Sequence, residues 1–235
     1  MLDLLLHLAE YSGSSPFLLL DVDCLFLASS APLFQAIEAD GVISYVIEEL
    51  AADTTYDNNG LTLQQLQVVG NEIAGSPIQP IQPCGGEIIG ARSPVANEVA
   101  STAHWAIGKG HERFSQKRPR FLTEEHVLSF TLAYLGLPAG NANGMIRRLW
   151  TQRSYRNVHQ SDLDLLIWHL PAEKSYGFAR LFREVTNPGS RFWGLPIGAE
   201  YSQYLGSHVG VPSTNLRKRL SDGWTAFLRR TWNTR

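Results

Sequence analysis

The stretch Phe17-Leu18-Leu19-Leu20-Asp21-Val22-Asp23 places two carboxylates directly after four apolar residues. A short apolar run that follows a loop rich in Ser, Gly and Pro is typical of a buried strand. Carboxylates at the end of such a strand need a partner, because burying an unpaired charge is costly. A divalent cation is a common partner, and Mg²⁺ or Mn²⁺ often holds a substrate phosphate too. The stretch therefore suggests a metal site, although an Asp pair can also begin an ordinary loop.

The composition sets broad limits on the class of protein. The chain has 235 residues, a formal net charge of -2, and 20 glycines and 12 prolines spread along it. This length suits one large domain or two small ones, and the charge gives no overall signature of nucleic-acid binding. The cysteines Cys24 and Cys84 form neither a metal-binding spacing nor a disulfide framework, which favours a reducing compartment and leaves a bridge between them open.

The N-terminal residues are amphipathic and lack the basic region of a signal peptide, and no segment is apolar for long enough to span a bilayer. We therefore expect a cytoplasmic protein.

Patterns typical of helices and strands alternate along the chain. Expected helices cover residues 2–11, 32–37, 61–73, 94–107, 123–135 and 213–232, and expected strands cover 17–20, 42–46 and 163–168, with a Gly-rich turn and short strand at 84–91. Thr123 is the expected N-cap of its helix, where the dipole favours the acids Glu124 and Glu125. Residues 51–60 and 109–120 are expected to be loops. The alternation predicts an α/β fold, a mixed sheet flanked by helices.

Two later segments carry candidate site residues. His169 ends an apolar run as the Asp pair does, so its imidazole could complete a metal shell, and Lys174 could contact a diphosphate. The alternative is a core histidine and a solvated lysine. In Gly85-Gly86-Glu87 the glycines would let a ligand approach the backbone, and the acid could bind sugar hydroxyls. The alternative there is a plain turn with Glu87 facing solvent.

These segments, in their order along the chain, resemble glycosyltransferases of the GT-A fold. Phe17–Leu27 followed by Pro32-Leu33-Phe34 resembles their Asp-x-Asp region, and Cys84–Ala91 resembles their acceptor-side turn and strand. The helix start at Thr123-Glu124-Glu125-His126 resembles the acidic helix start beneath the donor sugar. Residues 167–174 resemble the C-terminal segment whose histidine binds metal. The order and separations agree over residues 1–185.

The resemblance implies a partial GT-A-like (Rossmann-like) core over residues 1–185, followed by a C-terminal loop and basic helix over 186–235. It implies metal-dependent transfer of a sugar from a nucleotide-sugar donor to a carbohydrate or other hydroxyl acceptor, with Mn²⁺ or Mg²⁺ as cofactor. The implied metal ligands are Asp21, Asp23 and His169; the implied substrate-binding residues are Asp21, Gly85, Gly86, Glu87 and Lys174. Glu124 or Glu125 would act as base in an inverting reaction, or would stabilise an oxocarbenium-like state in a retaining one.

The chain departs from the family pattern in two ways. GT-A enzymes have a long nucleotide-binding βαβ segment before the Asp pair, whereas only twenty residues precede it here. We therefore expect either an N-terminally shortened chain or a minimal variant, and a catalytically inactive domain that binds a sugar or a protein is one alternative. The spacing from His169 to Lys174 and the lack of glycine near His169 also differ.

A haloacid-dehalogenase-type phosphatase is the rival enzyme class. Its Asp-x-Asp pair is usually followed by a Gly-Thr-like turn, whereas Cys24-Leu25 follows the pair here. That family also needs a later acidic pair at a strand end, and Asp162 and Asp164 instead precede their expected strand. The glycosyltransferase is therefore the favoured interpretation.

Residues 212–235 interleave basic side chains with leucines and aromatic residues. Such a helix can lie on an anionic membrane surface, which would place the protein at the inner face of a membrane. It can equally pack its apolar face on the domain and leave the arginines in water. We favour packing.

Overall fold

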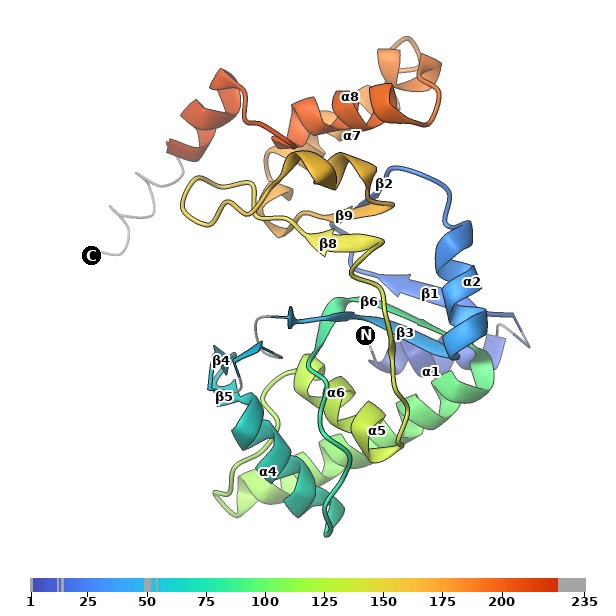
Figure 1. Cartoon of the computed structure of the whole chain (residues 1–235), viewed down its shortest axis with the longest axis vertical. Coiled ribbons are helices and arrows are strands. Elements are labelled where there is room, and N and C mark those ends of the chain that lie inside the picture. The colour runs from blue at the N-terminus through green and yellow to red at the C-terminus, as the bar shows by residue number, and fades with distance from the viewer. Residues whose placement is uncertain (1, 12, 14, 49–51, 54, 224–235) are drawn as a thin grey trace. The chain divides into compact units, whose positions relative to one another are not determined.

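The computed structural model describes residues 2–223 except residues 12, 14, 49–51 and 54. Contacts divide the chain into two compact units (Figure 1). The N-terminal unit comprises Met1–Asp21 and Ala31–Asn143, and the C-terminal unit comprises Val22–Ser30 and Gly144–Arg235. Both units contain a mixed sheet with flanking helices. The predicted α/β fold is confirmed.

The N-terminal unit is built on a four-stranded mixed sheet. Its strands, in the order β1-β6-β3-β7, are β1 (Phe17–Leu20), β6 (Cys84–Ala91), β3 (Val42–Val46) and β7 (Gly140–Asn141). The central strand β6 is antiparallel to both β1 and β3, whereas β3 and β7 are parallel. Beyond the last paired residue of β1, the Asp21 N–H donates to the Glu87 carbonyl at 3.1 Å, so the start of the Asp pair is fixed to β6.

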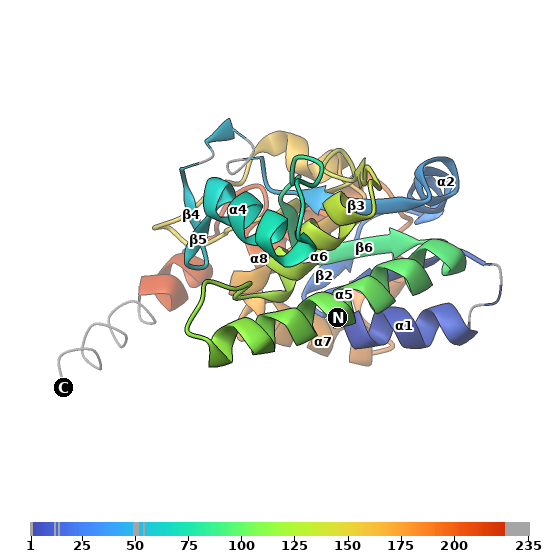
Figure 2. The ribbon, with the colours of Figure 1, turned by 90° about the horizontal axis from the view of Figure 1, so that it is seen from below.

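Helices cover this sheet and form two apolar clusters. They are α1 (Leu2–Tyr11), α2 (Ala31–Asp40), α4 (Leu63–Ala74), α5 (Ser93–Ser115) and α6 (Glu124–Tyr134). The helices α1 and α5 lie side by side (Figure 2). Leu5 and Ala100 from these helices pack with Ile89 of β6 in the first cluster. Leu66 of α4 and Phe130 of α6 belong to the second.

The C-terminal unit has a second, three-stranded sheet. Its strands, in the order β2-β9-β8, are β2 (Cys24–Phe26), β9 (Ile167–His169) and β8 (Ile146–Arg148). The remaining elements are η1 (Gln160–Asp164), η2 (Pro171–Glu173), α7 (Gly177–Thr186), η3 (Arg191–Gly194), α8 (Ala199–Val209) and helical residues 216–223. Trp168, Leu181 and Leu205 share its apolar core, so α7 and α8 belong to one unit, whereas the sequence suggested a boundary at residue 185.

Several expected elements are confirmed and others need correction. The strands at 17–20 and 42–46 and the helix at 2–11 match the structure, and Thr123 caps α6 by accepting the His126 N–H. Residues 84–91 are one continuous strand rather than a turn and a short strand. The expected loop at 51–60 contains β4 (Asp57–Asn58), which pairs with β5 (Leu61–Thr62). The expected C-terminal loop contains α8.

Two of these corrections have clear physical causes. The helix expected at 94–107 continues to Ser115, into the predicted loop, because Arg113 is buried and donates to Glu72 of α4 at 2.6 Å. This contact outweighs the low helix propensity of the intervening glycines. The strand expected at 163–168 begins instead as η1, because the Asp162 carboxylate accepts the His159 N–H at 2.6 Å and closes a turn. Only Ile167–His169 forms strand.

Within the described residues, no helix combines the length and the apolar character that crossing a membrane would require.

Candidate metal centre

The pairing of β2 with β9 brings together two segments that lie far apart in the sequence. Asp23 directly precedes β2, and Cys24 lies opposite His169 in the antiparallel register. The Leu170 N–H donates to the Asp23 carbonyl at 2.9 Å, which extends the pairing by one residue at each segment. The backbone therefore holds the carboxylate of Asp23 beside the imidazole of His169.

The Asp23 carboxylate is almost completely buried. Asp23 is 2% exposed and His169 is 4% exposed, and Oδ1 of Asp23 lies 3.5 Å from Nε2 of His169. Lys174 places its Nζ 3.0 Å from Oδ2 of Asp23, while its own side chain remains 64% exposed. Neither oxygen of Asp23 meets hydrogen-bond geometry with a donor of the described residues. A buried carboxylate with these neighbours fits a site for a cation, because its charge needs compensation that hydrogen bonds do not provide.

Asp21 ends the first segment of the N-terminal unit, Met1–Asp21, and is exposed. Only Val22 separates it from Asp23, so the two Cα atoms lie within about 7 Å of each other through the chain itself. Asp21, Asp23 and His169 thus supply two carboxylates and one imidazole as candidate ligands. Oxygen donors suit Mg²⁺ and Mn²⁺, and three protein ligands leave coordination positions for water or a phosphate.

Lys174 adds a positive charge on a flexible side chain at the exposed side of this centre. A lysine ammonium is a compact point charge, which suits contact with a phosphate. The structure therefore brings together Asp23, His169 and Lys174, three of the residues that the sequence singled out.

A second group of predicted residues meets within the N-terminal unit. The Glu125 carboxylate accepts the Gly86 N–H at 3.2 Å and the side-chain amide of Asn59 at 3.2 Å. Glu125 thus joins α6 to β6 and to the turn before β5. Glu124, the first residue of α6, has an exposed side chain. Of the two acids, Glu125 is the one that the described contacts connect to the predicted substrate-side glycines.

The side chain of Glu87 occupies the space that a side chain on Gly85 would need. Glu87 is only 1% exposed, so the alternative in which it faces solvent is wrong. A Cβ placed on Gly85 would lie 2.0 Å from Oε2 of Glu87. The missing side chain of Gly85 therefore makes room for the carboxylate of Glu87.

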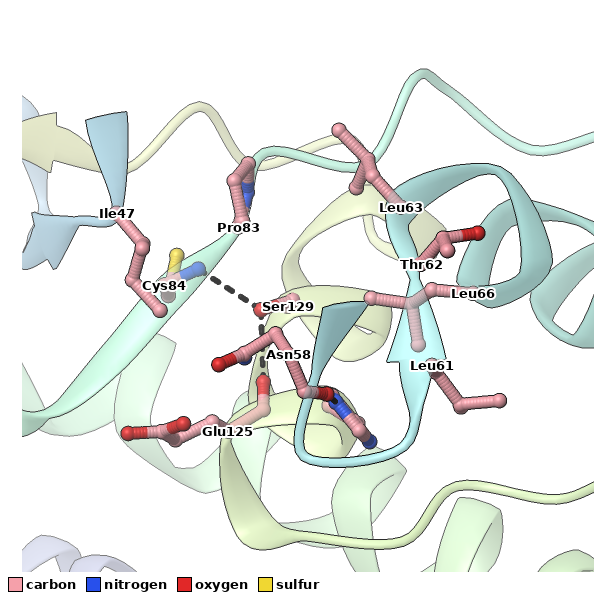
Figure 3. Close-up of a pocket in the computed structure, with 11 residues that line it drawn as sticks. Ile47, Asn58, Leu61, Thr62, Leu63, Leu66, Pro83, Cys84, Glu125 and Ser129 are labelled. Atoms are coloured by element: carbon pink, nitrogen blue, oxygen red, sulfur yellow. Dashed lines mark hydrogen bonds between the residues drawn. The ribbon is translucent and has the colours of Figure 1, made fainter. Parts of the chain in front are cut away.

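A small pocket lies beside Glu125 in the same unit (Figure 3). The Cys84 N–H donates to the Ser129 hydroxyl at 2.9 Å, and that hydroxyl donates to the Glu125 carbonyl at 2.7 Å. Burial raises the pKa of the Cys84 thiol to about 11. The thiol is therefore protonated near neutral pH and is a poor nucleophile and metal ligand.

His126 of α6, which also lines this pocket, contacts β4 and the loop that precedes α6. Its Nδ1 accepts the Leu122 N–H at 3.3 Å, and its Nε2 lies 3.0 Å from the Asn58 carbonyl. A neutral ring that donates from Nε2 satisfies both contacts. Burial lowers the pKa of His126, which favours this neutral form.

The sequence did not predict the most deeply buried ion pair among the described residues of the C-terminal unit, Glu173 with Lys218. The position of Glu173 between His169 and Lys174 was the only local signal. Lys218 lies in a strongly basic helix, where nothing in the sequence separates it from its solvated neighbours.

Comparison of the sequence with models of known protein families finds no match, and comparison with curated proteins finds none either.

Proposed function

We propose that this protein is a metal-dependent glycosyltransferase that moves a sugar from a nucleotide-sugar donor to an acceptor hydroxyl. The observation that carries the proposal is the buried carboxylate of Asp23, which lies beside His169 and has Nζ of Lys174 3.0 Å from its Oδ2. The order of motifs that resembles GT-A enzymes supplies the reaction class. Mn²⁺ or Mg²⁺ is the proposed cofactor.

The reaction breaks the bond between the anomeric carbon and the diphosphate and forms a bond from that carbon to the acceptor oxygen. A bound divalent cation would supply Lewis-acid neutralisation of the charge on the leaving diphosphate. Asp23 and His169 would bind this cation from the buried side, and Asp21, two residues before Asp23, would be the third ligand. Lys174 would turn its ammonium from Asp23 towards the diphosphate, which its 64% exposed and flexible side chain allows once a metal ion compensates the Asp23 charge.

The acceptor proton needs a base in an inverting transfer, and we propose Glu125 ahead of Glu124 for this role. Two donors, the Gly86 N–H and the Asn59 amide, fix the orientation of the Glu125 carboxylate. A carboxylate held in a fixed orientation meets the geometric requirement for proton transfer.

Calorimetric titration of Mn²⁺ and then of nucleotide sugars into the full chain tests the proposal. We expect nucleotide binding that depends on the metal. Asp23→Asn should weaken Mn²⁺ binding by at least about tenfold, because ligand shells of metal sites tolerate such changes poorly. Asp164→Asn is the matched control, since Asp164 is an exposed acid of the same unit. Absence of any metal-dependent nucleotide binding by the wild-type chain would contradict the proposal.

A non-catalytic domain that binds nucleotides or sugars is the second candidate. The observation that favours it is the Lys174–Asp23 ion pair itself, because the Lys174 ammonium in this position can take the place of a metal ion. In that case nucleotide binding would persist in the presence of a chelator, and Lys174→Met would abolish it. For a phosphatase, Asp21→Asn would instead abolish hydrolysis of a simple phosphomonoester. Asp162, one of the acids such an enzyme would need, is already paired with Arg147 at 2.8 Å.

A further inference from the structure

The C-terminal unit contains an ion pair that is closed off from solvent. Glu173 is 0% exposed and Lys218 is 1% exposed, and Nζ of Lys218 lies 2.6 Å from Oε1 of Glu173. The Thr151 hydroxyl donates to the same oxygen, and Lys218 also contacts Oδ1 of Asp222 at 3.1 Å. The pair joins the helical residues 216–223 to the end of η2.

Glu173 lies within the segment that carries two residues of the candidate metal centre. His169 ends β9, η2 follows one residue later, and Lys174 comes directly after Glu173. The Leu170 N–H bonds the Asp23 carbonyl at 2.9 Å, and the Glu173 N–H bonds the Leu170 carbonyl at 3.0 Å. A shift of Glu173 would therefore displace the backbone of residues 169–174, which carries the side chains of both His169 and Lys174.

This pair is poorly explained as a device for stability alone. Replacing a buried ion pair by apolar residues of similar volume is often neutral or stabilising, because desolvation offsets the attraction. The fold nevertheless makes room for it on both sides. A Cβ on Gly177 would lie 2.6 Å from Oε2 of Glu173, and a Cβ on Gly210 would lie 2.7 Å from Cδ of Lys218. Such close packing fixes where each charge sits.

We propose that Lys218 is a positioning residue for the candidate metal centre. By holding Glu173, it sets the place of η2, and η2 in turn sets His169 and Lys174 on Asp23. The consequence of this positioning for catalysis rests on the proposed glycosyltransferase function. The C-terminal helix then controls metal affinity without contributing a ligand.

The test uses the full chain with Glu173→Gln and Lys218→Met together. This pair of changes removes both charges of the Glu173–Lys218 pair together and costs Asp222, whose side chain is 21% exposed, its contact with Lys218. The amide oxygen that the first change introduces would still accept from the Thr151 hydroxyl. Arg217→Met is the control, because Arg217 is an exposed cation on the same helix. Two readouts are needed at a temperature where circular dichroism shows all variants folded: amide hydrogen exchange at Leu170 and at position 173, and Mn²⁺ affinity measured by electron paramagnetic resonance.

We expect faster exchange at both amides and an increase in the Mn²⁺ dissociation constant of about tenfold in the double variant, the lower range for residues behind metal ligands. Arg217→Met should leave both unchanged. If the amide exchange rates of the double variant equal those of the wild-type chain, the proposal is overturned. The same holds if its affinity for Mn²⁺ is unchanged. If the wild-type chain binds no Mn²⁺ but exchange still rises, the proposed function fails while the positioning of the segment is supported.

Glu173→Asp provides a second route if the double variant does not fold. It keeps the charge but withdraws the carboxylate by one methylene, so η2 must shift to restore contact with Lys218. Weaker Mn²⁺ binding or faster exchange at Leu170 would support the positioning role. Wild-type values of both would overturn it.

Discussion

At the scale of single residues, His126 makes stability depend on pH. Burial lowers its pKa in the folded protein, whereas the unfolded chain has the ordinary value of about 6.5. Below that value the unfolded state binds more protons than the native state, so the free energy of unfolding falls as the pH falls. Well above the pKa of about 6.5 in the unfolded chain, neither state is protonated and His126 contributes no pH dependence.

Urea unfolding of His126→Gln and His111→Gln variants at pH 7, 6 and 5 measures this effect. His111 is an exposed histidine of α5 and serves as the control. We expect stability to fall less steeply between pH 7 and 5 in His126→Gln than in His111→Gln. Equal slopes in the two variants would show that His126 does not cause the dependence.

The candidate site shows which residues a sequence can reveal. Asp23 and His169 stand out because each follows an apolar run, and this local pattern survives in the fold as the ends of paired segments. The ion pair of Glu173 and Lys218 depends instead on which distant segments pack together. Local sequence contains no information on that packing, because both residues are ordinarily solvated.

At the scale of elements, local apolar patterns predicted β1, β3 and α1 well, and α4 except that its expected first residues, Leu61 and Thr62, form β5. The glycines of β6 made this strand harder to predict, because glycine favours turns locally but serves close packing here. A Cβ on Gly90 would lie 2.5 Å from the Ile37 side chain of α2. Tertiary contact therefore decides the conformation at 84–91, as it does for the long α5.

The helical residues 216–223 differ from the expected packing. Leu216 and Leu220 are 71% and 66% exposed, whereas the cation between them, Lys218, is buried. Residues four apart lie on one face of a helix, so the two leucines share an exposed apolar edge beside Arg217 and Arg219. Apolar and basic side chains together suit an anionic membrane surface.

Sedimentation of the full chain with vesicles of phosphatidylserine and phosphatidylcholine tests this contact. We expect the wild-type chain to bind, and Leu216→Ser with Leu220→Ser to weaken binding by about tenfold, since each leucine buries apolar area in the interface. Val68→Ser is the control, because Val68 is an exposed apolar residue of the other unit. Equal binding by both variants would exclude these leucines as the contact.

At the scale of the whole molecule, the division into two units follows from one pairing that the sequence does not show. Residues Val22–Ser30 leave the N-terminal unit and contribute β2 to the sheet of the C-terminal unit. A linear prediction assigns neighbouring residues to one domain, so it placed Asp21 and Asp23 in a single core over residues 1–185. The chain instead passes from one unit to the other between them.

Because of this division, we expect a bound metal ion to stabilise mainly the C-terminal unit. Asp23 and His169 both belong to the C-terminal unit, which holds three of the four tryptophans among the described residues: Trp150, Trp168 and Trp193. Tryptophan fluorescence therefore reports mainly on its unfolding. A ligand that binds only the native state at a hundred times its dissociation constant stabilises that state by about 2.7 kcal/mol.

We expect Mn²⁺ at that concentration to raise the thermal midpoint seen by fluorescence by several degrees, and a chelator to reverse the shift. His169→Asn should remove most of the shift, because it deletes the only predicted ligand from β9. His159→Asn, at the start of η1 in the same unit, should retain it. If the midpoint of the wild-type chain does not respond to Mn²⁺, or if both variants respond equally, His169 is not a metal ligand and the candidate centre loses its buried nitrogen donor.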